Sequence, residues 1–243
     1  MTADPLLAAL EEAVERAREM DAPLSQRLGL IADTVRSLST DFAAAVDRLI
    51  TRLQVNGAGE TAPAPGDRMP DFALPDETGR LVTLGDVLAD GPAAVSFNRG
   101  HWCPYCRLNA VAMAEVQSEV AKAGGRIVAI VPETRKFTKA FKQDAAASFP
   151  VLTDMDNGYA LSLNLAIWVG EEMATMIAGA GWDLPRYQGN DAWMLPIPAT
   201  FVVGADGVIV ARHLDPDYRK RMDIDQLVSA LRAAAKPMPT TVA

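Results

Sequence analysis

The two cysteines of the chain, Cys103 and Cys106, are separated by two residues and lie between an apolar run and a helical pattern. The apolar run at residues 93–97 has the length of a buried strand, and the helical pattern at residues 107–123 ends at a pair of glycines. A strand that leads through a short loop into a helix is a unit of an α/β domain. The cysteine pair therefore predicts a fold that places both thiols at a strand-to-helix junction.

Strand-like and helical patterns alternate along the chain after residue 70. Short apolar runs predict strands, and longer periodic segments predict helices. The expected strands are residues 82–84, 93–97, 126–131, 151–153, 200–203 and 208–213, and the expected helices are residues 107–123, 135–147 and 223–235, with a helical and irregular stretch at 159–193. The turn at Asp206-Gly207 joins the last two strands as a hairpin. This order predicts a three-layer α/β/α fold with a mixed central sheet.

The first part of the chain has a different pattern. Residues 4–54 predict two or three amphipathic helices, with Asp4-Pro5 as the first cap and residues 39–41 as a break or a new N-cap. We divide the chain into a helical extension at 1–55, a linker rich in glycine, alanine and proline at 56–68, and an α/β domain at 69–243. Short helices need a surface on which to bury their apolar faces, so we expect them to cover the core or to form a homodimer interface.

Composition excludes several classes of protein. With 49% hydrophobic and 22% charged residues, the chain has enough apolar residues for a core and is not of the disordered type. Its 23 basic and 31 acidic residues give a net charge of −8, which repels nucleic acid and anionic membranes. No apolar run reaches the roughly 18 residues of a membrane span, and the first residues do not resemble a secretory signal. We expect a cytoplasmic protein that binds neither nucleic acid nor membranes.

Three interpretations of the cysteine pair compete: a zinc site, two ordinary buried thiols and a redox pair. A zinc site needs about four ligands, and the only histidines are His101 and His213. The redox interpretation is favoured, because the helix N-terminus stabilises a thiolate at Cys103 and makes it the nucleophile. Cys106, one turn further on, then resolves by closing a disulfide, and Pro104 fits the first helical turn. This chemistry requires neither a metal nor a bound cofactor.

Several neighbouring residues have two interpretations. Arg99 and His101 either lower the thiol pKa or belong to a solvated surface loop. Trp102 either covers the cysteine or packs without a chemical role. Glu133 is interpreted as a surface carboxylate, with a proton carrier as the alternative, and residues 215–221 are interpreted as a solvated loop.

Three segments resemble known proteins, in the expected order along residues 70–231. Residues 98–106 (NRGHWCPYC) resemble the active-site loop of thioredoxin-fold oxidoreductases. Residues 197–203 (IPATFVV) resemble the strand of these enzymes that begins at a cis proline. Residues 70–80 (PDFALPDETGR) resemble the opening of the alkyl hydroperoxide reductase and thiol-specific antioxidant family, the peroxiredoxin-like family.

The resemblance implies a thioredoxin-like fold with Cys103 as the attacking thiol and Cys106 as its partner. It also implies that Pro198 is cis beside them, so that the backbone groups of Ile197 face a substrate. The implied function is that of an antioxidant thiol oxidoreductase with a redox-active disulfide. Its substrate would be a disulfide or a hydroperoxide, and its reductant a thioredoxin- or glutaredoxin-type protein or a low-molecular-weight thiol.

Three positions depart from the peroxiredoxin pattern. Gly100 stands where that family has Thr or Ser, and Ser96 stands where it has Pro. Pro198 stands where the family has an arginine that binds the peroxide. Without these donors we expect slow reaction with peroxide and a leaning to thiol–disulfide exchange. A hydroperoxide reductase in which other groups replace them remains an alternative, and a redox-sensing interaction module is an alternative of another class.

Overall fold

The computed structural model describes residues 5–235, and it begins with three helices, α1 (Pro5–Glu19), α2 (Leu24–Leu38) and α3 (Thr40–Val55). The Ser39 hydroxyl accepts a hydrogen bond from the Phe42 amide at 3.2 Å and caps α3. The new N-cap predicted at residues 39–41 is therefore confirmed. The predicted cap at Asp4 lies outside the described residues.

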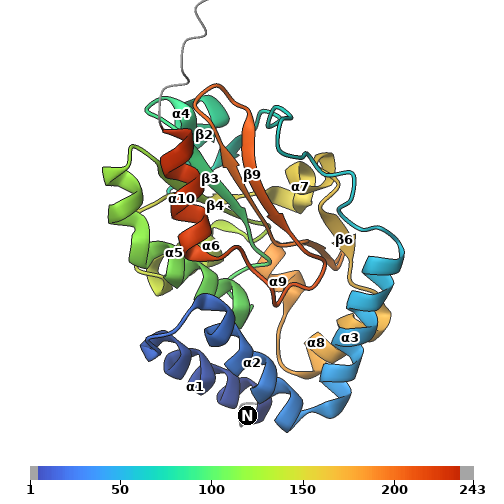
Figure 1. Cartoon of the computed structure of the whole chain (residues 1–243). Coiled ribbons are helices and arrows are strands. Elements are labelled where there is room, and N and C mark those ends of the chain that lie inside the picture. Colours follow the sequence, from blue (N-terminus) through green and yellow to red (C-terminus); the bar gives the residue numbers. More distant parts are fainter. Residues whose placement is uncertain (1–4, 236–243) are drawn as a thin grey trace, which may run out of the picture.

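A mixed sheet of five strands, in the order β5-β4-β3-β8-β9, forms the centre of the molecule (Figure 1). Its strands are β3 (Ala93–Phe97), β4 (Arg126–Val131), β5 (Val151–Thr153), β8 (Ala199–Val203) and β9 (Ile209–Leu214). The first three run parallel to one another, and β8 is antiparallel to both β3 and β9. The strands β3, β4 and β5 have the predicted bounds, because each is an apolar run flanked by polar or turn residues.

Helices cover both faces of this sheet, as the sequence predicts. On one face lie α5 (Pro104–Lys122), α6 (Arg135–Asp144) and α10 (Ile224–Ala234), whose apolar residues share one core with Ala94, Ile127 and Val202. On the other face lie α4 (Leu84–Leu88) and α7 (Gly158–Ser162), which pack against a second core. Successive strand residues alternate between the two cores, since side chains of a strand point to opposite faces.

Smaller elements surround the sheet. They are β1 (Ala73–Pro75), β2 (Leu81–Thr83), η1 (Met155–Asn157), β6 (Ala166–Trp168), α8 (Glu171–Gly179), α9 (Leu184–Gln188) and β7 (Met194–Pro196). The pairs β1–β2 and β6–β7 form two-stranded sheets, and β1, β6 and β7 are too short for sequence periodicity to predict. Among residues 5–235, no helix is both long and apolar enough to cross a membrane.

The N-terminal helices are packed on the α/β core. Helices α1 and α2 pack against α5, and α3 packs against α8 (Figure 1). Ion pairs strengthen this packing: Arg27 of α2 binds Glu115 of α5 with two hydrogen bonds of 2.8 and 3.0 Å. Arg107 of α5 binds Glu11 of α1 at 2.7 Å. The apolar faces of the three helices thus belong to the same core as α5 and α10.

Substitution of Ile31 in α2 tests whether these helices stabilise the whole molecule. Ile31 is fully buried, so Ile31→Ala should lower the free energy of unfolding by about 2–5 kcal/mol. Unfolding in urea, followed by both circular dichroism and tryptophan fluorescence, should remain a single transition.

The matched control is Leu38→Ala in the same helix, because Leu38 is half exposed and should cost less than about 1 kcal/mol. A separate early transition in Ile31→Ala, with an unchanged main transition, would contradict the packing of the helices on the α/β core.

Candidate active site

Three strand ends meet at one edge of the central sheet. Phe97, the last residue of β3, pairs with Ile130 of β4 on one side and with Ala199 of β8 on the other. The loop after β3, the residues after β4 and the residues before β8 therefore lie side by side. This edge brings together the cysteine loop, Glu133 and Pro198.

The cysteine pair begins helix α5. Cys103 is the N-cap residue, and Pro104 is the first helical residue, as predicted. Both cysteines are free thiols and buried, with exposed fractions of 1% for Cys103 and 0% for Cys106. The side chain of Cys103 makes no N-cap hydrogen bond. Among the described residues, no three His, Cys, Asp or Glu side chains have an arrangement that could hold a metal ion.

The sulfur of Cys106 receives the donors at this site. The backbone N–H of Arg99 lies 3.2 Å from it, a guanidinium nitrogen of Arg221 lies 3.4 Å from it, and the Cys103 thiol donates to it. Burial opposes ionisation of Cys106, but these donors and the two positive charges lower its pKa to about 5. Burial and the hydrogen bond to Cys106 raise the pKa of Cys103. The donors described here thus gather at Cys106 and favour negative charge there, whereas Cys103 takes no N-cap hydrogen bond from the helix N-terminus. The role of Cys103 as the nucleophile stays a prediction.

Arg99 is a buried cation and not a surface residue, with an exposed fraction of 5%. Its guanidinium lies over the ring of Tyr218 at 3.8 Å and faces the ring of Trp102 at 4.8 Å. Among the described residues it forms no ion pair with a carboxylate. Burial opposes its charge, yet negative charge on Cys103, Tyr218 and Cys106 raises the pKa of Arg99. Negative charge on either sulfur would therefore favour the charged form of Arg99.

His101 and Trp102 act through their packing. Burial and the positive charge of Arg107 lower the pKa of His101, so its imidazole is neutral at pH 7 and adds no positive charge near the cysteines. The indole of Trp102 donates a hydrogen bond to the Arg99 carbonyl at 3.1 Å. Its ring meets Trp182 edge-on at 5.6 Å between centroids. Trp102 therefore covers the site, which is one of its two sequence interpretations.

Glu133 is completely buried beneath the cysteine loop, so its interpretation as a surface carboxylate is wrong. One carboxyl oxygen accepts the backbone N–H of His101 at 2.7 Å, and the other has no hydrogen-bond partner among the described residues. Burial raises the pKa of Glu133 to about 8, so it holds a proton at neutral pH. The signal in the sequence is its place directly after a buried parallel strand, at the edge where the cysteine loop also lies.

The same carboxyl group explains Gly100. This glycine has a φ of 134°, and a Cβ atom added to it would lie 2.6 Å from the carboxyl carbon of Glu133. A threonine of the peroxiredoxin pattern does not fit there without a shift of the loop or of Glu133. The buried acid thus occupies the space that the missing side chain would need.

Two predictions on the strand before β8 are wrong. No cis peptide bond occurs among the described residues, so Pro198 is trans. The N–H of Ile197 donates to the carbonyl of Leu165 at 2.7 Å and is not available to a substrate. The antiparallel pairing of β6 with β7 brings Leu165 to this position and satisfies the amide that a cis proline would leave free.

A small apolar cavity lies over Cys103. Its volume is about 20 Å³, which is room for about one water molecule. Cys103 lines the cavity, whereas Cys106 is not among the lining residues. The cover comes from the N-terminal helices, α8 and the residues that follow it: Leu10, Val35, Phe42, Met173, Ile177 and Trp182.

Substitution of Glu133 tests its protonated state. Between pH 4.5, the ordinary pKa of a glutamate, and about pH 8, Glu133 is protonated in the folded protein but ionised in the unfolded chain. Because the folded state binds one more proton than the unfolded chain in this range, raising the pH from 4.5 to about 8 lowers the free energy of unfolding of the wild type relative to that of Glu133→Gln. The difference should change by up to about 1.4 kcal/mol per pH unit, measured by urea unfolding.

Glu12→Gln, at an exposed position of α1, serves as the control and should show no such difference. A wild type and Glu133→Gln protein with parallel pH dependence would mean that Glu133 is ionised when folded.

Comparisons with known proteins agree with this geometry. A model of the AhpC/TSA family matches residues 65–212. The 1-Cys peroxiredoxin PER1 of Hordeum vulgare is 25% identical over 187 residues, which cover 73% of this chain and 77% of the relative. The thiol-disulfide oxidoreductase ResA of Bacillus subtilis is 31% identical over 156 residues, covering 63% of this chain and 69% of ResA. The crystal structure of peroxidoxin BcpB from Mycobacterium tuberculosis matches with a TM-score of 0.54 at 22% identity, covering 70% of this chain and 97% of that chain.

The comparisons confirm the resemblance to the peroxiredoxin-like family. The family model spans more than half of the chain, and the mixed sheet between helices agrees with the fold of the peroxidoxin structure. The chain belongs to the AhpC/TSA family and is a peroxiredoxin-like, thiol-dependent oxidoreductase with a thioredoxin-like fold.

Proposed function

We propose that this protein reduces small hydroperoxides through a dithiol/disulfide cycle of Cys103 and Cys106. The observation that carries the proposal is the position of Cys103, which lines a small apolar cavity under the helical cover. A sulfur with an exposed fraction of 1% is open to a small oxidant sooner than to a folded protein that carries a disulfide. The sequence analysis favours thiol–disulfide exchange and names hydroperoxide reduction as the alternative.

Arg99 supports the hydroperoxide proposal. The sequence lacks the arginine that the family places at position 198, and its absence predicts slow reaction with peroxide. The buried guanidinium of Arg99 interacts with the charge on both sulfurs and brings a positive charge to the site from another direction. Positive charge beside the reacting atoms stabilises the oxygen that departs when the O–O bond breaks.

The chemistry begins with a proton transfer between the sulfurs. The Cys106 thiolate accepts the proton of the Cys103 thiol along their hydrogen bond, and the Cys103 thiolate attacks the terminal oxygen of the hydroperoxide. An S–O bond forms and the O–O bond breaks. The other oxygen leaves as an alcohol, or as water when the substrate is hydrogen peroxide, with the proton from Cys106, and Cys103 becomes a sulfenic acid.

The second step closes the disulfide. The Cys106 thiolate attacks the sulfur of the Cys103 sulfenic acid, an S–S bond forms, and hydroxide leaves as water after taking a proton from solvent. An external thiol then reduces the disulfide. We propose a thioredoxin- or glutaredoxin-type protein or a low-molecular-weight thiol as this reductant.

Thiol–disulfide exchange is the second candidate. The spacing of Cys103 and Cys106 favours it, because two thiols one helical turn apart can accept electrons from or pass electrons to an external disulfide. The relative ResA is named a thiol-disulfide oxidoreductase. In this alternative the helical cover has to move before a disulfide reaches Cys103.

Cysteine variants test the proposed cycle. Cys103→Ser should abolish consumption of hydrogen peroxide, the smallest hydroperoxide, because the sulfur that faces the cavity is lost. Cys106→Ser should leave the first step and block the second, so that a sulfenic acid persists on Cys103. Dimedone labelling and mass spectrometry identify the modified residue.

The wild type should instead form the Cys103–Cys106 disulfide and turn over with an external thiol. Labelling of Cys106 in Cys103→Ser as fast as labelling of Cys103 in Cys106→Ser would reverse the assignment. Oxidation that changes the oligomeric state without turnover would favour a redox sensor over an enzyme.

A further inference from the structure

A turn at residues 215–221 contacts the cysteine site from the C-terminal side, although its sequence predicts a solvated loop. The turn follows β9, whose last residue, Leu214, pairs with Ala199 at the beginning of β8. The chain therefore leaves β9 at the same sheet edge that carries the cysteine loop. This return brings a residue 115 positions away in the sequence to Cys106.

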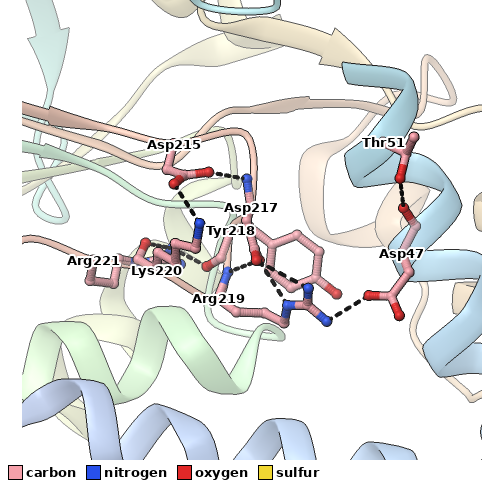
Figure 2. A network of polar contacts seen from close by, with 8 residues as sticks. All are labelled: Asp47, Thr51, Asp215, Asp217, Tyr218, Arg219, Lys220 and Arg221. Atoms are coloured by element: carbon pink, nitrogen blue, oxygen red, sulfur yellow. Dashed lines mark hydrogen bonds and ion pairs between the residues drawn. The ribbon is translucent and has the colours of Figure 1, made fainter. Parts of the chain in front are cut away.

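Polar contacts connect the residues of the 215–221 turn to one another and to α3. Asp215 accepts the amide of Asp217 at 2.8 Å and binds Lys220 at 3.0 Å. Arg219 binds Asp217 within the turn and Asp47 of α3 at 2.9 Å. Figure 2 shows Arg219 reaching from the turn toward Asp47 on α3. The turn is thus stabilised by contacts among its own residues and by one contact to the N-terminal helix α3.

Arg221 is the residue that this arrangement directs at the cysteines. One of its terminal nitrogens lies 3.4 Å from the Cys106 sulfur, and the other donates to the carbonyls of Tyr218 and Lys220 (Figure 2). Its Nε atom is buried and has no hydrogen-bond partner among the described residues. Within the same range of residues, Arg221 forms no ion pair with a carboxylate. The acidic group that contacts the Arg221 guanidinium is the Cys106 thiol.

We propose that Arg221 is a positioning residue that holds the Cys106 sulfur as a thiolate and so sets the rate of disulfide closure. The inference rests on the proposed dithiol cycle, in which Cys106 is the base of the first step and the nucleophile of the second. Both roles require the thiolate form of Cys106. Without Arg221, Cys106 returns to the thiol form more readily and the Cys103 sulfenic acid lives longer.

Other charged and titratable groups also face Cys106, and they define what Arg221 adds. The Cys103 thiol donates to Cys106 from α5, and Arg99 contributes its N–H and its charge from the loop after β3. The carboxyl group of Glu133, which follows β4, interacts electrostatically with Cys106, but it is protonated at neutral pH and carries no charge there. Arg221 is the group that reaches the sulfur from the segment after β9, so its removal leaves the other donors unchanged.

Titration of the thiolate tests this role. A positive charge at this distance lowers the pKa of an acid by about 1–3 units. In the reduced protein, Arg221→Met should raise the pH of thiolate formation by that amount, measured by absorbance at 240 nm, and Arg221→Lys should restore part of the shift. The same titration of Cys103→Ser and of Cys103→Ser with Arg221→Met assigns the shift to Cys106.

Lys220→Met is the matched control. Lys220 is the adjacent cation, its side chain is 57% exposed, and it pairs with Asp215 in solvent. An exposed pair of this kind contributes little, so Lys220→Met should titrate like the wild type. In a single turnover with hydrogen peroxide, Arg221→Met should accumulate dimedone-reactive sulfenic acid on Cys103, whereas Lys220→Met should not.

The result that overturns the inference is a folded Arg221→Met protein whose thiolate titrates within about 0.3 pH units of the wild type, far less than a nearby charge produces. Circular dichroism and the unfolding midpoint establish that the variant is folded, and Arg221→Lys serves if it is not. The titration needs no oxidant, so it stands apart from the proposed cycle. A wild type that forms no disulfide with hydroperoxide would overturn the cycle and leave the titration result intact.

Discussion

Burial of the Arg99 guanidinium beside two thiols imposes a charge balance on the whole site. A buried charge without a partner costs several kcal/mol, and no carboxylate among the described residues pairs with Arg99. The face of Tyr218 and the ring of Trp102 offset part of this cost through cation–π contacts. Negative charge on sulfur supplies the rest. The site therefore favours one thiolate in its resting state, and oxidation to a disulfide removes that charge.

The helical cover and the C-terminal turn follow from the same requirement. A guanidinium and two thiols stay desolvated only if something excludes water, and the N-terminal helices do this with apolar residues from α1, α2 and α3. The bond from Arg219 to Asp47 then links α3 to the turn that carries Tyr218 and Arg221 (Figure 2). The segment that looks like an appendage in the sequence is thus a wall of the active site.

Local signals in the sequence predict the scaffold well. The strands at 93–97, 126–131 and 151–153 have the predicted bounds, and the start of α5 at Pro104 follows from the preference of proline for the first helical turn. Each of these features depends on residues within one short segment. The position of the two cysteines at a strand-to-helix junction could be inferred for the same reason.

The electrostatics of the site could not be predicted in this way. Glu133 and Arg221 lie near the cysteines only because β4 and the β8–β9 hairpin flank β3 in the sheet, and neither residue lies in a motif. The polar residues around them in the sequence suggest that both side chains are exposed to solvent, although Glu133 is fully buried. The prediction that the Ile197 amide faces a substrate is wrong for a related reason, since this amide has a partner, Leu165, that only the folded chain brings close.

The oxidation rates of the reduced protein by hydrogen peroxide, the smallest hydroperoxide, and by a disulfide-bonded protein, compared at equal concentration, test the account most directly. Formation of the Cys103–Cys106 disulfide can be followed by the fluorescence of the nearby tryptophans. The account predicts faster oxidation by the hydroperoxide, with a rate proportional to its concentration, and a reaction with the protein disulfide that levels off at the rate at which the cover opens. Faster oxidation by the protein disulfide, proportional to its concentration throughout, would contradict it.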